Sequence, residues 1–251
     1  MEICITALGT GSAFTTENYQ SNFIVEINNK KLLIDCGTDI RHSLKTAQMT
    51  SADIDAIYIS HLHSDHCGGM EYVALTTYFN PNKDKPALYA KPIVLQGLWE
   101  VLRQGLIVLN DKLAAFKDYF NIYHTQSDFE WQNTKFELVQ TTHCKNAFAL
   151  MPSFGLWIPD VKVLLTTDTQ FDLYENRKEL YEKADTIFQD CETAKFPTGV
   201  HAHYNDLKTL PPEIKAKMYL YHYQDGELPD AEADGFKGFM KQGTTFYFGQ
   251  E

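Results

Sequence analysis

Three imidazoles and a carboxylate lie within six residues of the chain, at His61, His63, Asp65 and His66. Imidazole nitrogens and carboxylate oxygens are the ligands of zinc and of its first-row neighbours. A helix would scatter these side chains around its circumference, and a strand would place Asp65 and His66 on opposite faces. We therefore expect a tight loop, wrapped around cations, at the end of the apolar run 57–59. A histidine-rich surface turn is the alternative interpretation.

Four residues cannot complete the coordination of two cations, so further ligands are expected elsewhere in the chain. His143, Asp168 and His222 each follow an apolar run, at residues 138–142, 163–167 and 218–221. A single histidine after a strand usually has a structural role. Three such positions, each after its own strand, indicate side chains delivered to the edge of a sheet.

Strands dominate both halves of the chain, with helices interspersed, so the pattern predicts an α/β (α+β) fold of two packed sheets with helices outside. The chain contains no linker-like stretch, and we expect a single domain over residues 1–251. The interval 80–92 is polar and contains prolines, and it is expected to be a loop or lid. The tail after Asp225 has no clear assignment. Strands are expected at residues 3–8, 22–27, 31–34, 56–60, 120–123, 134–141, 149–158, 161–166, 186–189 and 218–221, and helices at 38–47, 70–79, 98–109 and 172–183.

The composition argues for a small ligand. The chain has 251 residues and a formal net charge of −11, whereas proteins that hold a long nucleic acid usually present a basic face. We therefore expect no long nucleic acid as a partner, and bound metals can supply the positive charge that a small anion needs.

Cysteine usage and apolar run lengths indicate a cytoplasmic protein. The five cysteines are scattered and form no Cys-x-x-Cys pair, which suits reduced thiols. Cys67 and Cys144 stand beside histidines but are interpreted as structural. The amino-terminal residues lack a signal-peptide pattern, and no apolar stretch reaches the ~20 residues that span a bilayer. We expect no membrane association.

Together these residues resemble the metallo-β-lactamase superfamily, over nearly the whole chain. The motifs run from residues 9–12 (Gly-Thr-Gly-Ser) through residues 35–37 (Asp-Cys-Gly) and the histidine loop to the three strand-end residues. The resemblance implies a four-layer αββα sandwich with two divalent metal ions, zinc or alternatively manganese. It implies that His61, His63 and His143 hold the first metal, that Asp65, His66 and His222 hold the second, and that Asp168 bridges both.

Within the superfamily, residues 8–13 resemble the opening of the ribonuclease Z-like phosphodiesterases. Those enzymes carry a glutamate–histidine pair that assists the leaving group, and the matching interval here contains Glu192 and His203, with His201 as an alternative acid. Glu192, His203 and Asp65 are therefore the residues expected to take part in catalysis. Asp35 is a candidate to accept a hydrogen bond from a metal-bound imidazole.

Residues 188–193, 199–204 and 221–226 are most similar to compact phage and bacterial enzymes that hydrolyse cyclic nucleotides, the anti-Pycsar phosphodiesterases. The resemblance implies hydrolysis of 3′,5′-cyclic mononucleotides such as cCMP and cUMP, and also cAMP and cGMP. The nucleophile would be a hydroxide shared between the two metals, which lower the pKa of their bound water towards 7. It also implies a homodimer and, for a phage protein, a role in the host cytoplasm against antiviral signalling. The alternatives are a ribonuclease Z-like tRNA 3′-end endonuclease, a non-catalytic nucleotide sponge, and a hydrolase of thioesters, lactones or β-lactams.

Overall fold

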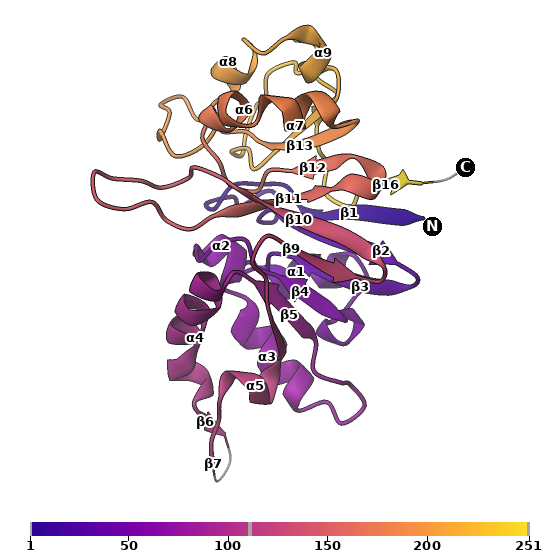
Figure 1. The fold of residues 1–251 in the computed structure, drawn as a ribbon, viewed down its shortest axis with the longest axis vertical. Coiled ribbons are helices and arrows are strands. Elements are labelled where there is room, and N and C mark those ends of the chain that lie inside the picture. Colours follow the sequence, from indigo (N-terminus) through magenta and orange to yellow (C-terminus); the bar gives the residue numbers. More distant parts are fainter. Residues whose placement is uncertain (1, 110–111, 250–251) are drawn as a thin grey trace. The chain divides into compact units, whose positions relative to one another are not determined.

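The computed structural model describes residues 2–109 and 112–249. These residues form two compact units, each built on its own seven-stranded sheet. Unit 1 comprises Met1–Gly9, Tyr19–Gln126 and Gln242–Glu251, and unit 2 comprises Thr10–Asn18 and Ser127–Lys241. The expectation of two sheets with helices is confirmed (Figure 1). The expectation of a single domain concerns how the two units associate, and it stays a prediction.

The sheet of unit 1 is antiparallel on one side and parallel on the other. Its strand order is β16 (Thr245–Phe248), β1 (Ile3–Gly9), β2 (Asn22–Ile27), β3 (Lys30–Ile34), β4 (Ala56–Tyr58), β5 (Ala87–Ala90) and β8 (Asn121–His124). From β3 to β8 the neighbouring strands run parallel, so their carboxyl ends meet at one edge. Asn28 and Asn29 turn β2 into β3 with φ of 53° and 59°, the left-handed pair that a two-residue hairpin needs.

Unit 1 also carries α1 (Ile40–Thr46), α2 (Ser64–Cys67), α3 (Met70–Tyr78), α4 (Pro92–Leu106), α5 (Phe116–Tyr119), a 3-10 turn at Ser51–Asp53 and the ribbon of β6 (Val108–Leu109) and β7 (Lys112–Leu113). Helix α4 begins six residues earlier than its apolar spacing predicts, because Pro92 suits the first helical position. Leu98, Leu102 and Leu106 are buried as the stripe predicts, but Val101 is exposed.

Five strands of the sheet of unit 2 point in one direction. Its order is β15 (Gly238–Phe239), β14 (Met218–Tyr221), β13 (Thr186–Asp190), β12 (Val163–Leu165), β11 (Phe154–Ile158), β10 (Thr134–Gln140) and β9 (Asp128–Trp131). Strands β12, β13, β14 and β15 are parallel, and β10 runs the same way because both β10 and β12 pair antiparallel with β11. The residues that follow β10, β12, β13 and β14 therefore emerge at the same edge of the sheet.

Helices α6 (Asp172–Asn176), α7 (Lys178–Lys183), α8 (Tyr204–Leu207) and α9 (Pro212–Lys215) lie together in unit 2 (Figure 1). Tyr181, Leu207 and Ile214 bury their side chains in one apolar cluster with strand residues such as Ile187 and Leu220. This packing fixes the strands whose ends carry the polar residues. A 3-10 turn at Pro159–Val161 connects β11 to β12.

Several expected elements are wrong in detail. The interval 80–92 contains β5, whose four residues are buried or half-buried, and is not a continuous loop. The expected strand 149–158 begins only at Phe154, and the expected helix 172–183 breaks at Arg177, where φ is −133°. The tail after Asp225 supplies β15 and β16. These strands have two to four residues, too few for periodicity to reveal them.

Close backbone approach explains the first glycines of the chain. A Cβ on Gly9 would come within 2.1 Å of the carbonyl oxygen of Gln20, and one on Gly11 within 2.6 Å of the Thr15 side chain. Neither glycine has a positive φ. The turn therefore uses glycine for space and not for a left-handed conformation.

Candidate functional site

The first candidate group, here called the histidine cluster, comprises His61, His63, Asp65 and His66 of unit 1. His61 and His63 lie in the segment that follows β4, whereas Asp65 and His66 lie on the one-turn helix α2. The prediction of a continuous loop is therefore wrong for the second half of the motif. A single helical turn does not spread adjacent side chains far, so a helix is compatible with clustering here.

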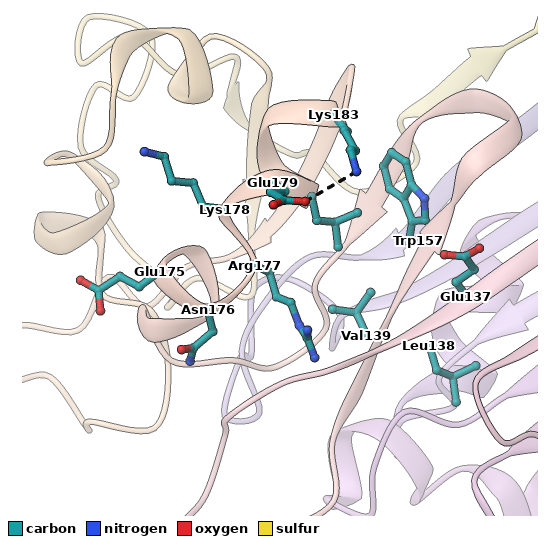
Figure 2. Close-up of a pocket in the computed structure, with 11 residues that line it drawn as sticks. Glu137, Leu138, Val139, Trp157, Glu175, Asn176, Arg177, Lys178, Glu179 and Lys183 are labelled. Atoms are coloured by element: carbon teal, nitrogen blue, oxygen red, sulfur yellow. Dashed lines mark ion pairs between the residues drawn. The ribbon is translucent and has the colours of Figure 1, made fainter.

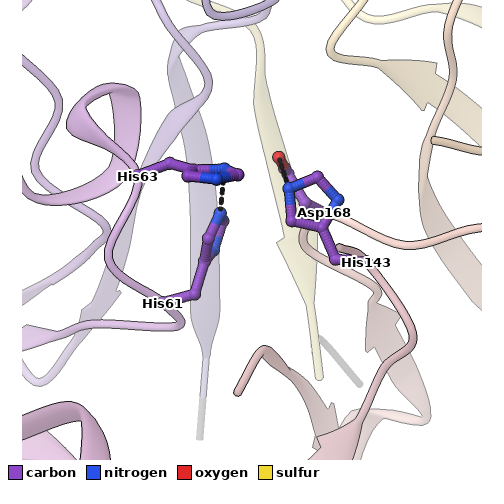
Figure 3. Close-up of side chains that lie close together, drawn as sticks. All are labelled: His61, His63, His143 and Asp168. Atoms are coloured by element: carbon purple, nitrogen blue, oxygen red, sulfur yellow. Dashed lines mark hydrogen bonds and ion pairs between the residues drawn. The ribbon is translucent and has the colours of Figure 1, made fainter. Parts of the chain in front are cut away.

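Ligand atoms within the histidine cluster face one another at metal-ligand spacing. His61 Nε2 lies 3.2 Å from His63 Nδ1 (Figure 3), and His66 Nε2 lies 3.1 Å from Asp65 Oδ2. Two ligands of one tetrahedral zinc ion, each about 2.0–2.1 Å from the metal, lie about 3.3 Å apart. The spacing and the donor types therefore both suit a divalent cation.

Asp35 and Ser60 orient two of these rings. Asp35 Oδ2 lies 2.7 Å from His66 Nδ1 and accepts the Ser60 hydroxyl at 2.8 Å, while Oδ1 accepts the Ser60 amide. Ser60 Oγ in turn lies 2.9 Å from His61 Nδ1. A carboxylate that accepts one ring N–H leaves the other ring nitrogen as the metal-binding atom. The predicted contact between Asp35 and a histidine of the motif is present.

The second candidate group, here called the strand-end cluster, comprises His143, Asp168 and His222 of unit 2. Asp168 Oδ2 lies 3.5 Å from His143 Nε2 and 3.6 Å from His222 Nε2, and Figure 3 shows the pair with His143. All three side chains are buried. His143 Nδ1 donates to the Val200 carbonyl at 2.8 Å, which again leaves Nε2 for a metal. Burial lowers the pKa of His143, more than the nearby Asp168 raises it.

Backbone strain accompanies both clusters. Asp35, Thr167 and His222 have φ of 60°, 51° and 67°, the left-handed region that L-residues other than glycine seldom adopt. Thr167 immediately precedes Asp168 and is β-branched, so its conformation costs of order 1–3 kcal/mol. Strain of this kind persists where the surroundings over-determine it, and here it coincides with the polar clusters.

His201 and Asp190 form a pair within unit 2 beside the strand-end cluster. His201 Nδ1 lies 2.8 Å from Asp190 Oδ2 and 3.9 Å from Asp168 Oδ2. Burial would lower the pKa of His201, but the carboxylates, Asp190 above all, outweigh it and raise the pKa to about 9. The ring also stacks on His222, with centroids 4.6 Å apart. Sequence reasoning named His201 only as an alternative acid and missed Asp190.

Glu192 and His203 do not form the expected side-chain pair. Among the described residues, the Glu192 carboxylate accepts only the Thr198 amide, at 3.0 and 3.1 Å. His203 Nε2 donates to the Ala194 carbonyl at 2.9 Å, and Nδ1 accepts the Asn205 amide. The two residues meet only through a backbone bridge. The sequence does offer one sign of Asp190: this carboxylate stands at the end of strand β13, much as Asp168 stands shortly after the end of strand β12.

A cavity of about 660 Å³ lies elsewhere in unit 2 (Figure 2). It is bounded by β10, β11, α6 and α7, with Trp157, Arg177 and Glu179 among its lining residues. No residue of the histidine or strand-end cluster lines it. We therefore place the chemistry at the clusters, where the ligand atoms of Asp168, Asp190, His201 and His222 lie within 4.8 Å of one another.

Comparison with solved structures identifies the fold. A diphosphatase of the PhnP family superposes with a TM-score of 0.76 at 19% identity, covering 99% of this chain and 98% of that one. The metallo-β-lactamase-fold protein YhfI from Bacillus subtilis superposes with a TM-score of 0.75 at 17% identity, covering 98% and 99%. The chain is a protein of the metallo-β-lactamase fold, with histidine and aspartate clusters that suit divalent metals.

Comparison with sequences identifies the family. The family model described as anti-Pycsar protein Apyc1 matches residues 3–246. A protein of that name from Paenibacillus harenae is 34% identical over 88% of this chain and 90% of its own length. Another, from Bacillus phage 010DV004, is 31% identical over 96% and 97%. The chain belongs to the anti-Pycsar Apyc1 family, and the resemblance inferred from its motifs is confirmed.

None of the helices in residues 2–109 and 112–249 has the length and apolar character that crossing a membrane requires.

Proposed function

We propose that this protein is a metal-dependent phosphodiesterase that hydrolyses 3′,5′-cyclic nucleotides to nucleoside monophosphates. Membership of the anti-Pycsar family supports a cyclic-nucleotide substrate. The observation that carries the chemistry is the pair of half-buried His201 and buried Asp190 beside Asp168. Hydrolysis of an alkyl phosphodiester must protonate a poor leaving group, and an imidazole held by a carboxylate is suited to that task.

We propose that the two clusters together supply the ligands of two divalent ions, zinc or manganese. His61, His63 and His143 would hold one ion, Asp65, His66 and His222 the other, and Asp168 would contact both. Ions at such ligands supply Lewis acidity and lower the pKa of a nearby water, which is the chemistry that phosphodiester hydrolysis requires.

The residues of this chain have distinct tasks in the proposed reaction. Asp35 and the Val200 carbonyl fix the tautomers of His66 and His143, so that Nε2 of each ring is the ligating atom. His201 Nε2 would donate its proton to the departing ribose oxygen. Asp190 would hold the His201 ring through Nδ1 and stabilise its charged form. We therefore assign the role of acid in the proposed reaction to His201 in place of His203.

Turnover of purified protein against cCMP, cUMP, cAMP, cGMP and cyclic dinucleotides, with and without chelator, tests the function. We expect nucleoside monophosphate from at least one cyclic mononucleotide and none in chelator. Stoichiometric binding of a cyclic nucleotide with no product in the metal-loaded protein would favour a sponge. Cleavage of precursor tRNA without turnover of cyclic nucleotides would favour an endonuclease.

The remaining parts of the proposal concern context. The family includes proteins of Bacillus phages, so we propose action in the cytoplasm of an infected host against cyclic-nucleotide defence signals. We also propose a homodimer. Light scattering with size-exclusion chromatography should give twice the chain mass of 28.8 kDa, and a monomer mass at assay concentration would contradict the dimer.

A further inference from the structure

Residues 193–202 form a closed loop between β13 and α8 of unit 2. Its two ends are joined by backbone bonds, from the Glu192 amide to the Ala202 carbonyl and from the Tyr204 amide to the Glu192 carbonyl, both 2.9 Å. The first residue of the loop, Thr193, is anchored because its amide and hydroxyl both donate to the Gln224 side chain. The loop is therefore fixed at its base.

Two buried side chains also tie the middle of the loop to this base. The Glu192 carboxylate, 1% exposed, accepts the Thr198 amide. The His203 ring, 9% exposed, donates from Nε2 to the Ala194 carbonyl. A buried carboxylate that accepts only one amide is costly to retain. Neither group reaches the leaving-group acid by a hydrogen bond, so their contacts indicate a role in holding the loop.

The loop held in this way presents an exposed cation and an exposed aromatic ring at its tip. Phe196 is 78% exposed, and Lys195 Nζ lies 5.5 Å from the centre of its ring. Within the described part of the chain, Lys195 has no carboxylate partner. Pro197 follows and restricts the backbone. An exposed aromatic ring on a tethered loop gains nothing for folding, but it is available to a ligand.

The same loop contains residues that take part in the proposed reaction or contact its groups. The Val200 carbonyl accepts a hydrogen bond from Nδ1 of His143, a proposed metal ligand, and His201 is the proposed acid. The tip therefore belongs to the segment that carries the chemistry, four residues before Val200. A nucleotide offers a flat base and an anionic phosphate, which match an aromatic ring and an ammonium. A cation here is also favourable in a chain of net charge −11.

We propose that Phe196 stacks on the base of the substrate, that Lys195 attracts its phosphate, and that Glu192 and His203 are positioning residues that hold this tip in place. The inference rests on the proposed cyclic-nucleotide activity. It assigns to Glu192 and His203 a role in substrate affinity instead of proton transfer, and it assigns substrate recognition to two residues outside both clusters.

Steady-state kinetics of metal-loaded Phe196→Ala and Lys195→Ala test the tip, with cCMP and methyl p-nitrophenyl phosphate as substrates. Loss of one base-stacking ring should raise KM for the cyclic nucleotide at least about fivefold. We expect kcat to stay within about twofold, and both constants for the ester to stay unchanged. Tyr247→Ala and Lys241→Ala, which change an exposed aromatic residue and an exposed lysine elsewhere, are the controls.

An unchanged KM for cCMP in both tip variants would overturn the proposal, as would an equal loss on both substrates. The proposed function is judged separately. If the wild-type protein hydrolyses the ester but no cyclic nucleotide, the result contradicts the proposed cyclic-nucleotide activity and does not contradict the geometry of the loop.

Glu192→Ala and Glu192→Gln test the positioning role. Glutamine keeps an oxygen that accepts the Thr198 amide, so we expect Glu192→Ala to raise KM for cCMP as Phe196→Ala does and Glu192→Gln to restore it. A proton-transfer role predicts a different pattern: both variants would lose kcat on cCMP while sparing the ester. That pattern would overturn the positioning role even if the tip variants behave as expected.

Discussion

The histidine cluster and the strand-end cluster offer the same kinds of ligand but are built in opposite ways. Four ligands of the first come from six consecutive residues, and the carboxylate of Asp35 orients one of its rings. The ligands of the second come from three strand ends spread over eighty residues, and a loop carbonyl orients His143. A local motif fixes its own geometry, whereas a dispersed cluster depends on the sheet and loops that bring its members together.

Removing a ligand from either cluster should have the largest effect. We expect His66→Ala and Asp168→Asn each to lower kcat for a cyclic nucleotide by at least about 10³-fold, because Lewis-acid stabilisation in such sites is worth several kcal/mol. Metal content by mass spectrometry and circular dichroism should show lost metal in a folded chain. Full activity of His66→Ala at trace metal would contradict the dinuclear proposal for the histidine cluster.

The proposed proton donor, His201, lies in unit 2, which gives the second prediction. His201→Ala should slow hydrolysis of a cyclic nucleotide by about 10²–10⁴-fold, the usual contribution of a placed general acid, and should spare a nitrophenyl ester whose leaving group needs no proton. His203→Ala serves as the matched control and should leave kcat for the cyclic nucleotide nearly unchanged. If His203→Ala instead shows the dependence on leaving group, the acid has been assigned to the wrong histidine.

A carboxylate and a carbonyl orient the two clusters, and the third prediction compares them. Asp35→Asn should weaken metal binding about 10- to 100-fold, as loss of such partners does elsewhere. Val200→Ala keeps the backbone carbonyl that His143 uses, so it should bind metal as the wild type does. Titration with a chelator of known affinity measures both. Equal metal affinity in Asp35→Asn and wild type would show that the carboxylate does not tune the histidine cluster.

The same contrast explains what the sequence could reveal. His61, His63, Asp65 and His66 are recognisable because their spacing is itself the signal. Asp190 is not, since it ends a strand of ordinary appearance and acquires meaning only when β13 lies beside β12. The pairing of Glu192 with His203 was implied by the resemblance to ribonuclease Z-like enzymes, but only a backbone bridge joins the two residues, and their side chains bond to atoms of the loop. Hydrophobic patterns predicted both sheets, including short strands such as β4 and β12, but they missed β5, β9, β15 and β16, in which two to four residues carry little pattern.

The smallest predicted effect concerns the segment that joins Thr10 to the strand-end cluster. The His222 amide donates to the Thr10 carbonyl at 2.7 Å, and the partly exposed Asp225 accepts the Thr15 hydroxyl and the Thr16 and Glu17 amides. Burial would raise the pKa of Asp225, but these hydrogen bonds outweigh it and lower the pKa to about 2. Because its pKa is lower in the folded chain, this carboxylate stabilises the fold at pH values above about 3.9, the pKa of aspartate in the unfolded chain. The stabilisation is lost as the pH falls towards 2.

Asp225→Asn should therefore lower the free energy of unfolding by about 1 kcal/mol at pH 6, a value reduced from the full shift because the group is partly solvated. The difference from the wild type should shrink between pH 4 and pH 2, because the wild-type carboxyl becomes protonated there. Urea unfolding at pH 6, 4 and 3 measures it, with the exposed Asp160→Asn as control. A constant difference across that range would show that the hydrogen bonds do not depend on the charge of Asp225. Backbone contacts such as that between His222 and Thr10, and not the charge of Asp225, would then support the strand-end cluster.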